Sequence, residues 1–242
     1  MNTIRLENKK NTKMIAHRGL SGIETENSYA AFVAAGNRDY YGVETDVHVT
    51  ADGRYAIFHD DSTGRICGKD LPLEGSDFAE LRALEMREAG TEKFSAVQKI
   101  PELSEYLRIM RRYEKTGVVE LKNAMAEKDI AGIAEVCARE YDLEKIVFIS
   151  FCYENLAALR RLLPRQKLQY LVGDEREEDA LLQDLQRYSL DLDIAYPLVT
   201  QRLLERMHGA NIAVNCWTCD DAAAARRLID WGVDMITTNI LQ

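Results

Sequence analysis

The sequence lacks a long hydrophobic run, an excess of basic residues and a leader-like beginning. No stretch of 18 consecutive apolar residues occurs in the 242-residue chain, so we expect no transmembrane helix and no membrane insertion. Acidic residues outnumber basic ones by 40 to 31, and a net charge of −9 argues against a nucleic-acid-binding protein, which normally carries a basic face. The first residues, MNTIRLENKKNTK, contain neither an apolar core nor a small-residue cleavage site, so we expect no secretory signal.

Cysteines are few and scattered. Their number, five, is odd and their spacing suggests no disulfide framework, which favours a reducing compartment and a cytoplasmic protein. Cys216 and Cys219 have the spacing of a redox or zinc pair, but no second such pair and no pair of histidines completes a zinc site. The alternative interpretation is two small apolar residues at the end of a strand.

What the sequence does contain is an alternation of strand-like and helical segments. Its composition, 46% hydrophobic and 29% charged, is typical of a globular protein, and 242 residues can form one α/β barrel. Strands are predicted at Met14–Ala16, Gly42–Val49, Tyr55–Phe58, Val118–Leu121, Ile146–Ile149, Leu168–Val172, Leu192–Ala195, Ile212–Asn215 and Met235–Thr238. Helices are predicted at Ser28–Ala35, Leu103–Tyr113, Glu127–Tyr141, Glu154–Leu163, Glu177–Tyr188, Gln201–Met207 and Ala222–Trp231. Strands that alternate with helices form parallel sheets, so the pattern predicts a TIM (β/α)8 barrel as a single domain over residues 1–242.

Three segments depart from this alternation. Tyr55–Phe58 follows a hairpin signal, Ala51-Asp52-Gly53, and should pair antiparallel with Gly42–Val49. Residues 61–99 form a long polar insertion after the second strand, for which we expect a loop and one short helix at Asp77–Met86. Only four residues, Asn239–Gln242, follow the last strand, so we expect a truncated or missing last helix. The barrel would then be capped by the N-terminal segment or by another subunit of a homo-oligomer.

Carboxylates recur at a spacing of two on the predicted strands. Glu44 and Asp46 point to the same side of their strand, because side chains alternate along it, and their hard oxygen ligands suit Mg²⁺ or Ca²⁺. Glu120 and Lys122 repeat this spacing on a third strand. Taken alone, the second pair would favour an ion pair at the strand end.

Histidines stand at the ends of two predicted strands. His17 and His59 each follow an apolar run and precede a charged residue, at the strand ends where barrel enzymes place their chemistry. Two such imidazoles could supply both an acid and a base for catalysis near neutral pH. Arg18 has the planar fork that grips phosphate, although a surface arginine is the alternative. We expect His48 and His208 to be non-catalytic.

A series of short motifs runs along the chain in a specific order. They are His17-Arg18-Gly19, Glu26-Asn27-Ser28, Glu44-Thr45-Asp46-Val47, Thr50-Ala51-Asp52-Gly53, His59-Asp60, Ile100-Pro101-Glu102-Leu103, Val119-Glu120-Leu121-Lys122, Ser150-Phe151, Val214-Asn215-Cys216-Trp217-Thr218 and Gly232-Val233-Asp234. Any one of them could occur by chance, but the ordered set resembles the glycerophosphodiester phosphodiesterase family. The resemblance covers the chain from about Met14 to Asn239.

The resemblance implies a metal-dependent phosphodiesterase that hydrolyses glycerophosphodiesters to glycerol 3-phosphate and an alcohol. It assigns the general acid and base to His17 and His59, without saying which is which. It assigns a divalent cation, Mg²⁺ or Ca²⁺, to Glu44, Asp46 and Glu120. The attacking group would be the substrate's own glycerol hydroxyl, giving a cyclic intermediate, or else water. The headgroup would be small and water-soluble, such as choline, ethanolamine or glycerol.

Five further residues are expected to bind or organise the substrate site: Arg18, Lys122, Trp217, Glu26 and Asn27. For Asn27 the alternative is a helix cap, and for Trp217 it is an aromatic packed in the bottom layer of the barrel. The family usually shows Thr-Asp where this chain has Thr238-Asn239, and the amide weakens any salt bridge there. Two other functions stay open: cleavage of lysophospholipids or sphingolipids on the same fold, and a non-catalytic phosphate-binding barrel.

Overall fold

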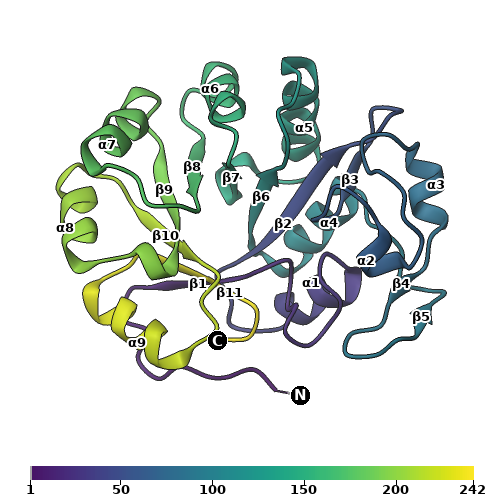
Figure 1. Cartoon of the computed structure of the whole chain (residues 1–242), viewed down its shortest axis with the longest axis horizontal. Helices are drawn as coiled ribbons and strands as arrows, with labels where there is room; N and C mark the ends of the chain where they lie inside the picture. The colour runs from purple at the N-terminus through teal and green to yellow at the C-terminus, as the bar shows by residue number, and fades with distance from the viewer. Residues whose placement is uncertain (1) are drawn as a thin grey trace.

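A closed barrel of parallel strands forms the centre of the molecule (Figure 1). The structure is a computed structural model and describes residues 2–242. Within these residues eight parallel strands close the barrel, because the first of them pairs with the second on one side and with the last on the other. In chain order they are β1 (Lys13–Ala16), β2 (Gly42–Val49), β6 (Thr116–Leu121), β7 (Ile146–Ser150), β8 (Lys167–Val172), β9 (Asp191–Ala195), β10 (Val214–Trp217) and β11 (Met235–Thr238). The predicted TIM barrel is confirmed.

Helices connect most of the barrel strands and lie outside them (Figure 1). They are α1 (Tyr29–Gly36), α4 (Leu103–Tyr113), α5 (Glu127–Glu140), α6 (Tyr153–Leu162), α7 (Glu178–Arg187), α8 (Gln201–Gly209) and α9 (Ala222–Trp231), with short 3₁₀ turns η1 (Leu143–Lys145) and η2 (Tyr196–Leu198). Most predicted boundaries agree to within a residue or two, because caps and periodicity coincide. Ser28, Thr200 and Asp221, for example, each cap a helix with a side-chain oxygen.

Alternating side chains of each strand serve two different layers. On β2 and β6, Val43, Val47, Val119 and Leu121 pack with the surrounding helices in the main core. A separate small cluster consists of Ile15, Val118, Val147, Ile149 and Leu171, against which Trp217 and Met235 pack. The period-two alternation that sends these residues into the barrel also sends Glu44, Asp46 and Glu120 there.

The segment after β2 contains more structure than the sequence predicts. As predicted, β3 (Tyr55–Ile57) pairs antiparallel with β2. Two short helices follow, α2 (Gly64–Cys67) and α3 (Phe78–Ala83), and then a two-stranded sheet of β4 (Met86–Arg87) and β5 (Phe94–Ser95). The prediction of a loop with one helix is therefore incomplete. Its widely spaced apolar residues form a core of their own with Phe58 and Ile100, comprising Ile66, Cys67, Leu73, Phe78, Leu81 and Met86.

The N-terminal segment and the C-terminal tail lie near one another in the lower part of Figure 1. No helix follows β11 in residues 2–242. Instead the tail pairs with the N-terminal segment: Ile4 N–H donates to Ile240 O at 3.0 Å, and Leu6 N–H donates to Gln242 O at 2.7 Å. The N-terminal segment thus packs where the last helix is missing, which is the first of the two predicted alternatives. None of the helices formed by residues 2–242 has the length and apolarity to cross a membrane.

Candidate active site

Three buried carboxylates meet at the carboxyl ends of β2 and β6. The parallel register places Asp46 opposite Glu120 and keeps Glu44 one step below on the same face. Each of the three offers an oxygen atom, and these atoms lie within 4.8 Å of one another. The cluster forms because the period-two spacing recurs on two neighbouring strands.

The cluster suits a divalent cation. Oε1 of Glu44 and Oδ1 of Asp46 are buried without a hydrogen-bond partner in residues 2–242. Burial, followed by the charges of Asp46 and Glu120, raises the pKa of Glu44 well above its usual range. Burial and the charge of Asp46 raise the pKa of Glu120 to about 7. A hard cation would supply both the missing partners and the missing positive charge, so the oxygen donor set fits Mg²⁺ or Ca²⁺.

Two cationic side chains flank the carboxylates. Lys122 Nζ lies 3.0 Å from Glu120 Oε1 and 3.4 Å from Asp46 Oδ1. Arg18 contacts Glu26 Oε1 at 3.0 Å and Asp46 Oδ2 at 3.6 Å, and its backbone N–H donates to Glu44 Oε2 at 2.8 Å. Burial acts to raise the pKa of Asp46, but the charges of Lys122 and Arg18 outweigh it and lower that pKa. Both cations therefore offset part of the negative charge of the acidic cluster.

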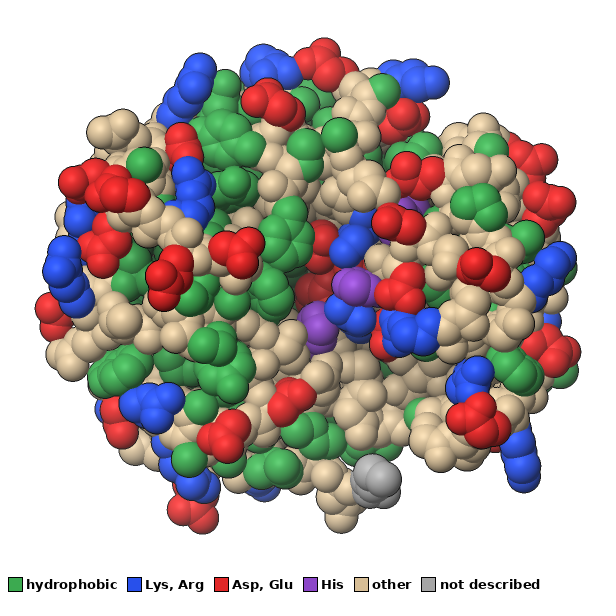
Figure 2. Space-filling model, in the orientation of Figure 1, with side chains coloured by type: hydrophobic (Ala, Val, Ile, Leu, Met, Phe, Trp, Pro, Cys, Tyr) green, Lys and Arg blue, Asp and Glu red, His purple; other side chains and the backbone are tan. Residues whose placement is uncertain are grey.

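His17 follows β1 and His59 lies just after β3, and both side chains line the same cavity. Together with Glu44 and Glu120 they line a cavity of about 60 Å³, and Figure 2 shows His, Asp/Glu and Lys/Arg side chains gathered in a central hollow. His17 Nε2 lies 4.0 Å from Glu44 Oε2. Burial, and then the charge of Arg18, lower the pKa of His17 to about 4. Burial also lowers the pKa of His59, although Asp46 opposes this. Both imidazoles are thus favoured in the neutral form.

The other two histidines lie elsewhere. His48 is fully buried, with Nδ1 3.1 Å from Glu74 Oε1 and Nε2 3.3 Å from the carbonyl oxygen of His59. His208 pairs with Asp234 at 2.8 Å in the last turn of α8. Neither lines the cavity between His17 and His59, which agrees with the expected non-catalytic role.

Glu26 and Asn27 act on other site residues. Asn27 is buried, its Nδ2 donates to Asp46 Oδ2 at 2.8 Å, and its Oδ1 accepts from Thr45 at 2.9 Å. Its backbone φ of 54° lies in the left-handed region. Glu26 joins Arg18 to Arg65. These contacts orient a carboxylate and a guanidinium of the site.

An apolar wall lies opposite the charged groups. Trp217 and Phe151 meet edge to face with ring centroids 5.5 Å apart, and both line the cavity with Ile149 and Leu171. Figure 2 shows hydrophobic side chains on one side of the central hollow. The Trp217 ring packs against the small interior cluster and also borders the cavity, so both interpretations of this residue describe part of its position.

Several groups near the site were not predicted from the sequence. Asp193 on β9 lines the cavity, is 1% exposed and has no partner for Oδ1 among residues 2–242, and burial raises its pKa well above the usual range. Arg65 pairs with both Glu26 and Asp60. Asp193 could have been found from the sequence, because it is a carboxylate inside an apolar strand. No sequence signal marks Arg65, because it lies in the polar insertion among other charged residues.

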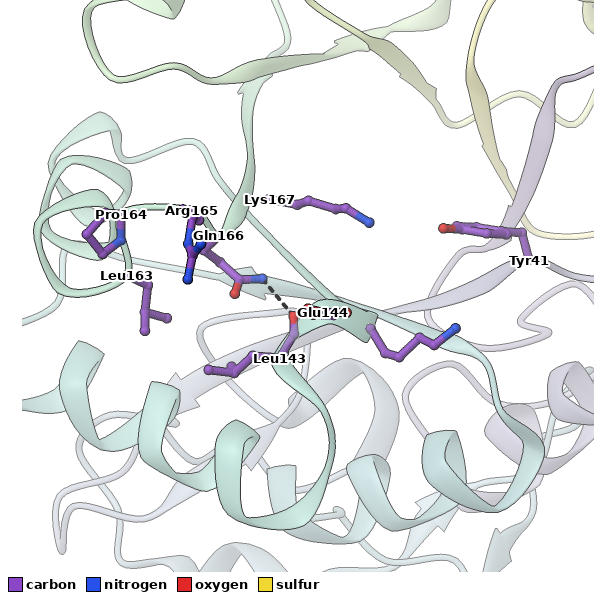
Figure 3. Close-up of a pocket in the computed structure, with 9 residues that line it drawn as sticks. Tyr41, Leu143, Glu144, Leu163, Pro164, Arg165, Gln166 and Lys167 are labelled. Carbon is purple, nitrogen blue, oxygen red and sulfur yellow. Dashed lines mark hydrogen bonds between the residues drawn. The ribbon is translucent and has the colours of Figure 1, made fainter.

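A larger cavity, of about 750 Å³, lies at the opposite end of the barrel (Figure 3). It is lined by Tyr41 just before β2, by η1 and by the segment that leads into β8. In Figure 3 the side chain of Lys167 points toward the hydroxyl of Tyr41. This larger cavity is lined by none of the predicted site residues. In a barrel, residues at the amino ends of the strands usually contribute to stability.

Comparisons with known proteins agree with the motifs. The model of the glycerophosphoryl diester phosphodiesterase family matches residues 17–241. A glycerophosphodiester phosphodiesterase of Caldanaerobacter subterraneus subsp. tengcongensis is 29% identical over 237 residues, which cover 94% of each chain. One from Bacillus altitudinis is 26% identical over 234 residues, again 94% of each. The solved structure of an Oleispira antarctica phosphodiesterase with its product sn-glycerol-3-phosphate has a TM-score of 0.86 at 27% identity, over 94% of this chain and 92% of that one.

The family match begins at His17 and continues past the last barrel strand, so it includes every residue of the acidic cluster and both cavity histidines. The predicted resemblance is therefore confirmed over nearly the whole chain. The chain belongs to the glycerophosphoryl diester phosphodiesterase family.

Proposed function

We propose that this enzyme hydrolyses glycerophosphodiesters to glycerol 3-phosphate and an alcohol. The observation that carries the proposal is the convergence of two imidazoles, a guanidinium and two carboxylates of the acidic cluster on one small cavity, with Asp46 and Lys122 in contact with that group. Membership of the family supports the reaction class, and the Oleispira antarctica neighbour binds sn-glycerol-3-phosphate as its product.

Glu44, Asp46 and Glu120 would hold a divalent cation, Mg²⁺ or Ca²⁺. When bound, the cation neutralises charge on the phosphate and favours the ionised form of the attacking hydroxyl. The protein prepares this place by burying the carboxylates and by fixing Asp46 through Asn27 and Glu44 through the backbone N–H of Arg18. These hydrogen bonds hold the oxygens in position before any ligand arrives.

His17 and His59 would act as the base and the acid. The base removes a proton from the attacking hydroxyl, whose oxygen forms a bond to phosphorus. The bond between phosphorus and the headgroup oxygen breaks, and that oxygen takes a proton from the acid. If the nucleophile is the glycerol hydroxyl of the substrate, the first product is a cyclic phosphate that water opens in a second step. Attack by water gives glycerol 3-phosphate directly.

Arg18 and Lys122 would contact the phosphate. Both are less than one-fifth exposed, with side-chain exposures of 18% and 14%, and both already face Asp46 at the cavity. Charge that develops on the phosphate oxygens would attract them more strongly in the transition state than in the ground state. Burial in a cavity with an apolar wall strengthens that attraction, because less water screens it.

One observation favours a second candidate function. The ring of Phe151 is 47% exposed beside the cavity, and Trp217 extends the same apolar surface. Such a surface could contact the hydrocarbon part of a lysophospholipid as well as a small headgroup. The two substrate classes differ in size and in apolar area, so they can be separated by kinetics.

The test is a substrate panel. Glycerophosphodiesters with choline, ethanolamine or glycerol, and lysophospholipids, are incubated with Mg²⁺, Ca²⁺ or excess EDTA, and glycerol 3-phosphate and free alcohol are quantified. We expect turnover of the small diesters that depends on a divalent cation. Release of headgroup only from lysophospholipids would establish the second candidate. Absence of hydrolysis for every diester would refute the proposed function.

A further inference from the structure

A chain of hydrogen bonds leads from His17 away from the cavity to Asp220. His17 Nδ1 lies 2.8 Å from Asn239 Oδ1, and Asn239 Nδ2 lies 2.6 Å from Asp220 Oδ2. These residues border a second hollow of about 420 Å³ next to the active site. Asn239 stands where the resembled family usually has an aspartate, so the carboxylate here lies one residue further from the imidazole.

Asp220 determines which way the amide of Asn239 points. Its Oδ1 accepts from the backbone N–H of Asn239 at 2.7 Å and from the hydroxyl of Thr238 at 2.8 Å. An ionised carboxylate can only accept hydrogen bonds, so the NH₂ group of Asn239 must face Oδ2 of Asp220. The carbonyl oxygen of Asn239 is thereby turned toward His17 and toward the hydroxyl of Ser21, which lies 2.7 Å away.

The direction of the amide in turn determines the tautomer of His17. A carbonyl oxygen accepts, so Nδ1 of His17 must carry the hydrogen. The hydroxyl of Thr218, 3.5 Å from the same nitrogen, can accept from it as well. A neutral imidazole has one ring hydrogen, which leaves the lone pair on Nε2. That nitrogen is the one on the side of Glu44 and the cavity.

We propose that Asp220 and Asn239 are positioning residues that hold His17 as the Nδ1–H tautomer, so that Nε2 accepts the proton of the attacking hydroxyl. This inference rests on the proposed function, and it assigns the role of base to His17 and the role of acid to His59. The partner of His59 differs: its Nδ1 lies 2.7 Å from Oδ1 of Asp60, and this carboxylate opposes the burial that lowers the pKa of His59.

The first test is spectroscopic and requires no variant. Long-range ¹H–¹⁵N correlation spectra of the ¹⁵N-histidine-labelled enzyme near neutral pH distinguish the two tautomers, and the signals of His17 are identified by their loss in His17→Gln. We expect protonated Nδ1 and unprotonated Nε2 at His17. A dominant Nε2–H tautomer would overturn the proposal. Because no substrate is present, this result stands or falls independently of the proposed function.

The second test removes and then restores the chain of hydrogen bonds. Asp220→Asn frees the amide of Asn239 to turn, and we expect kcat to fall roughly 10- to 100-fold, as for other partners that orient a histidine, with KM nearly unchanged. The double variant Asp220→Asn with Asn239→Asp restores one carboxylate and one amide in exchanged positions. It should recover the Nδ1–H tautomer and much of kcat.

The control makes the same chemical change one residue along the chain. Asp221 caps α9 by accepting from the backbone N–H of Ala224 at 2.6 Å, and asparagine caps a helix nearly as well. Asp221→Asn should keep the tautomer, kcat and thermal stability of the parent. Parent-like kcat in Asp220→Asn, or failure of the exchanged pair to exceed the single variant, would contradict the positioning role.

Discussion

The two sides of the catalytic cavity are built from different halves of the chain. Residues 17–122 supply the acidic cluster, both cavity histidines and the two cations that face them. Residues 149–217 supply mainly the apolar wall of Ile149, Phe151, Leu171 and Trp217, in which Asp193 is the exception. The same strand-helix unit thus produces a charged wall in one half, which we propose is reactive, and an apolar, inert wall in the other.

This difference indicates that the two walls of the cavity have different roles. In the proposed function the charged wall binds and orients the substrate and moves protons, whereas the apolar wall excludes water and shapes the substrate pocket. Low polarity on one side strengthens the electrostatic attraction exerted by the other. If this division is correct, substitutions on the charged wall should reduce kcat and those on the apolar wall should mainly change KM.

The largest expected effect is at the two histidines. His17→Ala or His59→Ala should reduce kcat by roughly 10²- to 10⁴-fold, the usual contribution of a positioned acid or base. The double variant should lose far less than the product of the single losses, because the two act as one unit. Steady-state kinetics measures this, with His208→Ala as a control at the end of α8. Near-parent turnover by either cavity variant would refute its assignment.

Next in size is the carboxylate cluster. Glu44→Gln keeps the shape of a buried side chain but removes a charge, so it should lose cation binding and about 10³-fold in rate, equivalent to several kcal/mol. Calorimetric titration with Mg²⁺ or Ca²⁺ and kinetics on the same protein check both losses. Glu135→Gln, at an exposed position on α5, is the matched control. Tight cation binding by the Glu44 variant would contradict the proposed site.

Lys122→Met should reduce kcat/KM by about 30- to 100-fold, the value of about 2–3 kcal/mol for a charge-assisted contact. With cation in excess, the melting temperature should change little, because the cation compensates Glu120 and Asp46. In EDTA the variant should be less stable than the parent, because it leaves two buried carboxylates without their cationic neighbour. A lower melting temperature with near-normal turnover in excess cation would mean that Lys122 holds the fold instead.

Stability should also show the coupling between protons and cation. In the cation-free fold Glu120 keeps its proton up to a pKa of about 7, whereas the unfolded chain releases it near 4.5. The stability that protonated Glu120 contributes is therefore complete below pH 4.5 and is lost as pH rises toward 7. A bound cation removes this loss because it favours the carboxylate.

The melting temperature difference between Mg²⁺- or Ca²⁺-loaded and chelated protein should thus increase from pH 4.5 to pH 7. The lowered pKa of His17 acts in the opposite direction, with stability lost as pH falls from 6.5 toward 4, but it contributes to both arms of the comparison. Glu120→Gln should flatten the difference. A difference that shrinks as pH rises would exclude carboxylates as the groups that hold the cation.

The charged wall was largely predictable from the sequence, and the reason is local. Glu44 and Asp46 lie two residues apart on an apolar strand, and the histidines follow strands directly, so alternation and strand ends suffice to place these four side chains. Glu120 joined them through the family resemblance, because Glu120 and Lys122 taken alone favour an ion pair. The barrel itself was predictable for the same reason, because each strand-helix unit carries its own periodic pattern and caps.

The missing parts depend on contacts between distant segments. Asp220 reaches His17 only through Asn239, across 203 positions of sequence, and no local pattern marks it. The insertion is polar in sequence and its apolar residues are widely spaced, yet Leu73, Phe78 and Leu81 are buried in one cluster with Phe58. Contacts between distant segments determine whether such elements form, and the periodicity of a single sequence carries no information about those contacts.

The smallest expected effect is on the apolar wall, and it tests the division most directly. Phe151→Ala removes a half-exposed ring that touches Trp217, which should raise KM about 3- to 10-fold, consistent with about 1 kcal/mol of lost contact, and leave kcat nearly unchanged. Phe151→Leu, which keeps apolar area, should recover part of the loss. Steady-state kinetics on the preferred diester and on a lysophospholipid measures both. A larger KM effect for the lysophospholipid would mean that the wall contacts the hydrocarbon part of that substrate. A fall in kcat as large as that of the Lys122 variant would mean that the wall takes part in the chemistry, and the division between a reactive and an inert side would be wrong.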